Sequence, residues 1–178
     1  MIDYKELATT IHNNAKAKGF YDKSDDLCFE AHQQLEIIKE ICEFHEAYKK
    51  GKTAKDKPKG AYHGEDNILF FQKYIKDTYE DELADIVIRG LDFLAFNDDI
   101  EVIDNNVLHD GNFISIKGDY DISLHCYTMI SDVYSNYVFY VIDNVFMIAR
   151  TLGVDLEWHI RAKMEYNTSR ERLHGKKF

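Results

Sequence analysis

The sequence contains few residues that interrupt helices. Among 178 residues there is a single proline, Pro58, and only nine glycines. Proline and glycine oppose helix formation most strongly, whereas the plentiful Glu, Lys, Leu and Ala favour it. We therefore expect one all-α domain over residues 1–178, long enough to bury a hydrophobic core.

Cysteine, long apolar runs and excess positive charge are also lacking. The three cysteines, Cys28, Cys42 and Cys126, form no C-x-x-C pair, which argues against a thiolate metal site and favours a reduced, cytoplasmic setting. No apolar run approaches the roughly 20 residues of a membrane span, and the polar segment 1–6 does not resemble a signal peptide. The net charge of −10 argues against binding to a nucleic-acid polymer or a membrane surface.

Hydrophobic periodicity predicts a helical bundle of about five helices. The expected helices span about 3–18, 26–50, 65–96, 121–152 and the stretch from Asp155 onward. Between 97 and 119 the helical pattern breaks. Val107–Leu108 and 113–116 flank the Asp110-Gly111 dipeptide there, which predicts a short hairpin.

Two acid-x-x-acid pairs lie on two of these helices: Glu40 with Glu43, and Glu82 with Asp85. Residues three apart in a helix share one face, so each pair can direct its carboxylates at one point. Four converging carboxylates repel one another unless a hard cation lies between them. Oxygen ligands of this kind suit Mg²⁺.

Each pair also has a structural explanation. On the helix 26–50 the acids can form a solvated acidic face. The second half of the helix 65–96 is apolar nearly all round and should be buried, where unpaired carboxylates are costly. There Arg89 can form a salt bridge with Asp85 or Asp92 that needs no metal.

Two groups of cations can bind phosphate. Residues 49–65 form a loop with six lysines that could reach over a phosphate, although such runs are often solvated: Lys49, Lys50, Lys52, Lys55, Lys57 and Lys59. Lys163, Asn167 and Arg170 share one face of the final helix, where Arg can bind phosphate oxygens in bidentate fashion. A surface helix with scattered cations explains the second group equally well.

Taken together, these motifs resemble the MazG-like family of all-α nucleoside triphosphate pyrophosphohydrolases, in its phage and bacterial form. The resemblance covers residues 1–96 and about 145–178. It is carried by the two acidic pairs, by residues 11–20, by residues 163–170 and by the closing stretch 174–178.

The resemblance implies a reaction and a metal site. Family members bind Mg²⁺, for which Mn²⁺ can substitute, and cleave between the α- and β-phosphates to give a nucleoside monophosphate and pyrophosphate. The implied metal ligands are Glu40, Glu43, Glu82 and Asp85. Glu36 or Glu46 would assist a ligand or orient the attacking water.

The resemblance also implies how the substrate is held. Phosphate or sugar would be bound by the face of the final helix, through Lys163, Asn167 and Arg170. The base side would be lined by residues near the end of the first helix: Asn14, Lys18, Phe20 and Tyr21.

The chain departs from compact family members over about 97–145, where an insertion carries an extra long helix. Family members of this kind are homo-oligomers, so we expect a dimer or tetramer unless the inserted helix replaces a partner helix. The insertion could instead enlarge the base pocket.

Two other functions fit parts of the sequence. A di-iron carboxylate bundle needs Glu-x-x-His pairs from two helices, and the sequence offers only Glu171 with His174. A non-catalytic helical module that binds a nucleotide or a protein remains the alternative. No glycine-rich phosphate loop and no Ser/His/Asp or Cys/His arrangement is evident.

Overall fold

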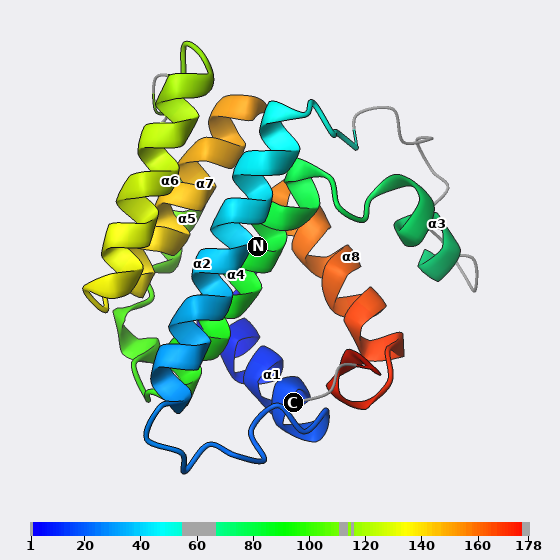
Figure 1. The fold of residues 1–178 in the computed structure, drawn as a ribbon, viewed down its shortest axis with the longest axis vertical. Helices are drawn as coiled ribbons and strands as arrows, with labels where there is room; N and C mark the ends of the chain where they lie inside the picture. Colours follow the sequence, from blue (N-terminus) through cyan, green and yellow to red (C-terminus); the bar gives the residue numbers. More distant parts are fainter. Residues whose placement is uncertain (1, 55–66, 111–113, 115, 176–178) are drawn as a thin grey trace.

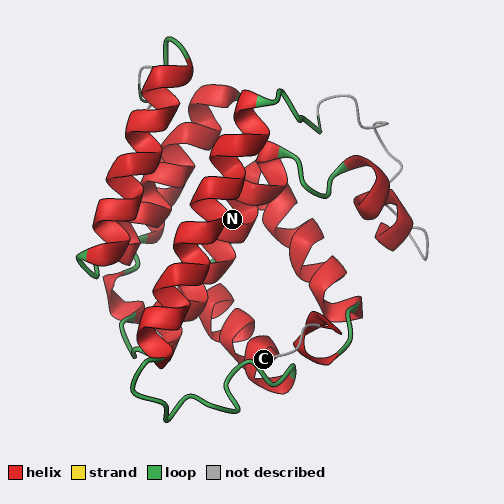
Figure 2. Ribbon diagram, in the orientation of Figure 1, coloured by secondary structure: helices red, strands yellow, loops and turns green. Residues whose placement is uncertain are grey.

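The computed structural model describes residues 2–54, 67–110, 114 and 116–175, and within this part of the chain the regular elements are all helices, joined by loops and turns (Figures 1 and 2). The expected all-α bundle is confirmed. The α-helices are α1 (Tyr4–Ala17), α2 (Phe29–Lys49), α3 (Asn67–Tyr74), α4 (Tyr79–Phe96), α5 (Asn105–Asp110), α6 (Asp119–Tyr134), α7 (Val138–Leu152) and α8 (Leu156–Ser169). Short 3₁₀ turns lie at Ile100–Val102 and Arg172–Gly175.

Helix α4 is the centre of the bundle and packs against α1, α2, α7 and α8 (Figure 1). Its apolar side chains, including Leu83, Ile86 and Leu91, are fully buried, as expected for a helix that is apolar nearly all round. Helix α6 packs against α2 and α7, on the opposite side of the bundle from α8. Helix α3 packs against α8 around a small second core that includes Phe71 and Tyr166.

Two predicted long helices are each divided in two, so the expected count of about five helices is too low. The predicted helix 65–96 breaks at Asp77, and the predicted helix 121–152 breaks at Asn136. Both residues have a φ of 62°, in the left-handed region that Asp and Asn tolerate better than most residues. Thr78 then caps α4 by accepting a hydrogen bond from the Asp81 backbone N–H.

The predicted hairpin is wrong. Val107 and Leu108 lie in helix α5, and Leu108 is buried in the main core. Of the second expected strand, 113–116, residues 113 and 115 lie outside the described residues, as does Gly111 of the expected turn. Asp104 explains the helix, because its carboxylate accepts hydrogen bonds from the backbone N–H groups of Asn106 and Val107 at 2.9 and 3.4 Å.

The predicted helix ends near the two termini are confirmed. Asp3 caps α1 by accepting from the backbone N–H groups of Lys5 and Glu6, and Asp155 caps α8 through the Trp158 N–H. Gly19 follows α1 with a φ of 82°, which a glycine adopts without strain. Among the described residues, no helix has both the length and the apolar character needed to cross a membrane.

Gly90 allows α4 and α7 to approach closely. A Cβ atom at this position would lie 2.9 Å from Ile142 Cγ1 and 3.3 Å from Val138 Cγ1. We expect Gly90→Ala to lower the free energy of unfolding by about 1–2 kcal/mol, because overpacking outweighs the better helix propensity of alanine. Urea denaturation would measure the change.

Gly118→Ala is the matched control for this substitution. No atom lies within 4 Å of a Cβ built at Gly118, and its φ of 172° suits any residue. Its cost should be about 0.5 kcal/mol, the value for alanine at a helix N-cap. Equal effects of the two substitutions would show that the α4–α7 contact is not tight.

The three cysteines differ in exposure, and all are free thiols. Cys28 and Cys42 are exposed, whereas Cys126 is buried and its burial raises the pKa of its thiol to about 12. Since the thiolate is the reactive form, we expect a thiol reagent at pH 8 to modify two cysteines rapidly in the native protein. The third should react only after unfolding, and rapid modification of Cys126 in the native protein would contradict its burial.

Candidate active site

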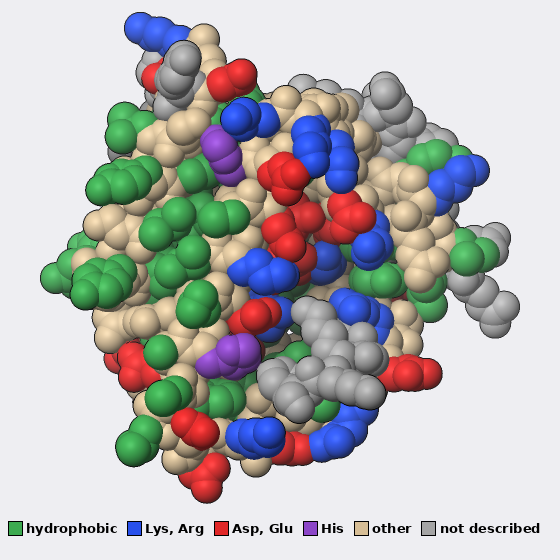
Figure 3. All heavy atoms as spheres, viewed as in Figure 1, with side chains coloured by type: hydrophobic (Ala, Val, Ile, Leu, Met, Phe, Trp, Pro, Cys, Tyr) green, Lys and Arg blue, Asp and Glu red, His purple; other side chains and the backbone are tan. Residues whose placement is uncertain are grey.

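A pocket of about 350 Å³ opens between the central helix and three of its neighbours. Its described lining comes from α1, α2, α4 and α8, from residues just after α1 and α8, and from Lys76 and Asp77 in the turn before α4. None of the described residues of the insertion 97–145 lines it, so the idea that the insertion enlarges the base pocket finds no support. On the face of the molecule drawn in Figure 3, acidic side chains gather near the middle, with basic side chains around them.

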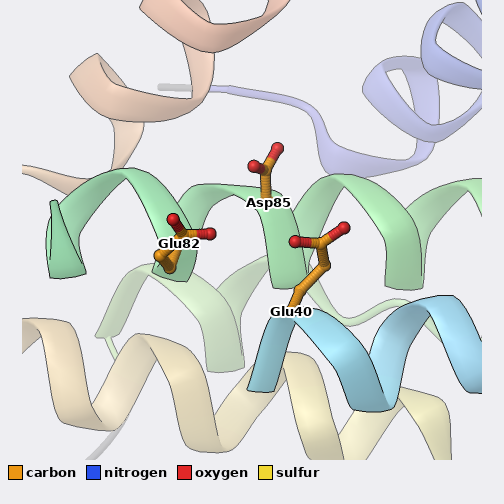
Figure 4. A group of neighbouring side chains, drawn as sticks. All are labelled: Glu40, Glu82 and Asp85. Atoms are coloured by element: carbon orange, nitrogen blue, oxygen red, sulfur yellow. The ribbon is translucent and has the colours of Figure 1, made fainter. Parts of the chain in front are cut away.

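Three carboxylates converge on this pocket, one from α2 and two from α4 (Figure 4). Glu40, Glu82 and Asp85 each offer an oxygen, and these oxygens lie within 4.8 Å of one another. Glu40 and Glu82 are buried, with only 4% and 7% of their surface exposed. The sequence predicted all three from the spacing of the acid pairs.

The other predicted acids lie farther out. Glu43 lines the pocket but lies outside the group of three, and its carboxylate is 3.3 Å from Lys39 Nζ. Glu36 does not line the pocket and instead lies 3.4 Å from Arg89 Nη2. Glu46 is exposed, outside the pocket, and pairs with Lys50 on the same helix.

The closeness of the carboxylates makes their ionisation unfavourable. Burial, followed by the charge of Asp85, raises the pKa of Glu40 to about 7. Burial and the charges of Asp85 and Asp81 raise the pKa of Glu82 to about 8. A cation that enters between these carboxylates would reduce their mutual repulsion and stabilise their ionised forms.

Lys163 supplies one internal counter-charge. Its Nζ lies 2.5 Å from Asp85 Oδ2 and 3.0 Å from both oxygens of Asp81, and all three side chains are largely buried. Burial lowers the pKa of Lys163, but the charges of Asp85 and Asp81 outweigh it, so the net pKa lies above its usual value. Lys163 was predicted to hold phosphate or sugar, and here it holds these two aspartates.

Asp81 is the buried site residue to which sequence reasoning gave no role. It is 1% exposed, and it also accepts a hydrogen bond from the Asp77 backbone N–H at 3.1 Å. Burial and the charge of Asp85 raise its pKa to about 7. Its position four residues before Asp85, on the same helix face, was the available signal.

Arg89 joins α4 to α2. Its Nε lies 3.6 Å from Glu40 Oε1, and its Nη2 lies 3.4 Å from Glu36. The predicted salt bridge with Asp85 or Asp92 is therefore replaced by pairs that cross to the neighbouring helix. Asp92 instead pairs with His12: its Oδ1 lies 2.8 Å from His12 Nδ1, within hydrogen-bonding distance.

The basic and amide groups of the predicted phosphate face also lie on the pocket. Asn167 and Arg170 both line it, and the buried Asn167 Oδ1 finds no hydrogen-bond donor among the described residues. Lys18 lines it too, but its Nζ donates to the backbone carbonyls of Thr168 and Arg170, which ties the end of α1 to the end of α8. Lys18 therefore serves as a structural contact in this arrangement.

Only some of the residues predicted to line the base side lie on the pocket. Asn14 and Phe20 line the pocket near the apolar side chains of Ile88 and Met164. Tyr21 does not line it. Its ring is buried 4.5 Å from the ring of His12 and 5.3 Å from that of Phe96, so Tyr21 is a core residue of this region.

No family model matches the chain, and searches of curated proteins and of solved structures find no match either. The family resemblance, the expected homo-oligomer and the role of the insertion therefore remain predictions from the motifs. What the fold and the site define is an all-helical protein with a pocket that combines buried carboxylates, cations and an apolar wall.

Proposed function

We propose that the protein is a Mg²⁺-dependent nucleotide pyrophosphohydrolase that converts a ribo- or deoxyribonucleoside triphosphate to the monophosphate and pyrophosphate in the cytoplasm. The observation that carries this proposal is the group of Glu40, Glu82 and Asp85 within 4.8 Å, on the wall of a pocket. The same pocket has an apolar wall that suits the base of a nucleotide and cationic groups that suit its phosphates.

The donor set suits a hard divalent cation. Glu40, Glu82 and Asp85 would hold Mg²⁺ or Mn²⁺ through carboxylate oxygens, and Glu43, which follows Glu40 on α2 and lines the same pocket, would be the fourth ligand. When bound, such a cation neutralises phosphate oxygens and favours ionisation of a water molecule. Its charge would also relieve the repulsion that raises the pKa values of Glu40 and Glu82.

The remaining pocket residues would orient the substrate. Phe20, Ile88 and Met164 would offer apolar surface to a base, while Asn167 and Arg170 line the same pocket from α8 and the residue after it and would contact the polar part of the substrate. In the reaction a water oxygen bonds to the α-phosphorus and the bond to the bridging β-oxygen breaks. The products are monophosphate, pyrophosphate and one proton, so the protein supplies no covalent nucleophile.

A turnover assay tests this proposal. Purified protein would be incubated with Mg²⁺ and the common ribo- and deoxyribonucleoside tri- and diphosphates, and the products would be separated by ion exchange. Monophosphate and pyrophosphate from at least one triphosphate are expected, with loss of turnover in chelator. Release of orthophosphate instead of pyrophosphate would contradict the proposed bond cleavage.

One observation favours the alternative, a non-catalytic nucleotide- or protein-binding module. Lys163 already pairs with Asp81 and Asp85, so part of their negative charge is compensated without a metal. Calorimetry with Mg²⁺ distinguishes the two functions, because a module of this kind would bind nucleotide without a divalent cation. Nucleotide binding that is unchanged by chelator, with no turnover, would favour the module.

A further inference from the structure

A second hollow, of about 360 Å³, lies beside the carboxylate pocket. Its described lining comes from two segments that are distant in sequence, 52–54 after α2 and a stretch from the end of α3 to Thr78 before α4. Lys76 and Asp77 line both hollows, so the turn before α4 separates one from the other. Glu82, one of the three clustered carboxylates, lies in the first turn of the helix that follows.

The second hollow is rich in positive charge. Lys52, Lys73 and Lys76 line it, and Asp77 is the one acid among its described lining residues. Asp77 lies 3.2 Å from Lys76, which leaves two lysines in excess in a protein whose net charge is −10. Lys52 belongs to the lysine-rich stretch singled out in the sequence, whereas Lys55, Lys57 and Lys59 lie outside the described residues.

The segment that carries Lys52 is held in place by residues at the start of α4. Glu80 is buried and accepts hydrogen bonds from Thr53 Oγ1 at 2.6 Å and from the Ala54 N–H at 2.9 Å. The Tyr79 N–H donates to the Lys52 carbonyl at 3.0 Å. The start of α4 therefore fixes this segment against the end of α3. Both carboxylate oxygens of Glu80 accept these hydrogen bonds.

We propose that this second hollow is an anion subsite that binds the terminal phosphates of a nucleoside triphosphate, and pyrophosphate after cleavage. The assignment to terminal phosphates rests on the proposed function. If the α-phosphate lies beside the three carboxylates and the base packs against the apolar wall, the β- and γ-phosphates extend past the carboxylates. Lysine ammoniums bind such oxygens as point charges. The subsite makes the enzyme selective for triphosphates over diphosphates.

Binding of inorganic pyrophosphate tests the subsite without any turnover. Calorimetry would be performed in chelator, where the metal-free carboxylate pocket repels the anion. We expect the wild-type protein to bind pyrophosphate and Lys52→Ala/Lys73→Ala to bind it about tenfold more weakly. Lys23→Ala/Lys117→Ala is the matched control, because it removes the same charge from exposed lysines outside both hollows and should leave binding unchanged.

The possible results separate the subsite from the proposed function. Absence of pyrophosphate binding, or equal weakening in both double variants, overturns the subsite even if the protein turns over triphosphates. Selective weakening in Lys52→Ala/Lys73→Ala supports an anion site even if no nucleotide is hydrolysed. In an active enzyme the same variant should raise KM for the triphosphate about tenfold, whereas Lys23→Ala/Lys117→Ala should leave it unchanged.

Discussion

Replacing Glu82 by Gln is expected to lower nucleotide turnover by about a thousandfold or more, while the fold is retained. Glu82 is one of the three carboxylates within 4.8 Å, and the amide keeps its size but not its charge. The cation would then be held by fewer anionic ligands, and its electrostatic stabilisation of the transition state would weaken. Steady-state kinetics over a range of Mg²⁺ concentrations would measure the loss.

The same substitution should not destabilise the protein in chelator. In the folded chain the pKa of Glu82 is raised to about 8, so the folded state binds this proton more tightly than the unfolded state does. Ionisation of Glu82 therefore costs stability as the pH rises toward 8, and the neutral amide avoids that cost. Thermal unfolding should also show that Mg²⁺ stabilises the wild-type protein and has a much smaller effect on the variant.

Glu46→Gln provides the control for Glu82→Gln. Glu46 is an exposed glutamate on α2 that pairs with Lys50 and lies outside the pocket, so its replacement should leave turnover unchanged. Normal activity and normal metal dependence in the Glu82→Gln protein would refute the proposed site. Equal losses in both variants would point to a general effect of charge.

Replacing Lys163 by Met should produce the largest loss of stability, about 3 kcal/mol at pH 8. The substitution removes the ammonium that lies 3.0 Å from both oxygens of Asp81, a residue with 1% exposure, and 2.5 Å from Asp85. Two carboxylates would then remain close together with little compensation. Urea denaturation in chelator would measure the change in the free energy of unfolding.

The loss should depend on pH in a defined direction. The pKa of Asp81 is raised to about 7 in the folded protein, well above its usual value of 3.8. Protonation therefore stabilises the folded state, and this contribution is lost as the pH rises through 7. We expect Lys163→Met to be less destabilising at pH 5 than at pH 8.

Two further variants make the Lys163 prediction specific. Lys50→Met removes an exposed ion pair and should cost about 1 kcal/mol or less. Adding Asp81→Asn to Lys163→Met should restore part of the stability, because the amide oxygen can still accept from the Asp77 N–H. If Lys163→Met is as stable as the wild type, Lys163 does not compensate the buried aspartates.

The helical fold and the centre of the site could be predicted because both depend on local spacing. Glu40, Glu82 and Asp85 follow from acid pairs three residues apart, and the burial of α4 follows from its apolar pattern. The breaks at Asp77 and Asn136 were missed because neither glycine nor proline marks them. Each residue instead adopts left-handed backbone geometry inside a continuous apolar pattern.

Long-range pairings could not be predicted from one sequence. Lys163 contacts aspartates about eighty positions earlier in the chain, and Arg89 pairs with the acids of α2. Tyr21 was expected on the base side from the family resemblance, but only the fold decides which of two adjacent aromatic residues lines the pocket. The second hollow likewise depends on the folding of 52–54 against the end of α3.

The contact between Lys163 and the aspartates has a consequence for synthesis on the ribosome. A nascent chain that has emerged as far as Phe96 already contains Asp81 and Asp85, but it does not yet contain Lys163, whose ammonium pairs with both. The end of α1 must likewise wait for the carbonyls of Thr168 and Arg170 before Lys18 can bind them. The bundle around α4 therefore cannot reach its final arrangement until α8 has been synthesised.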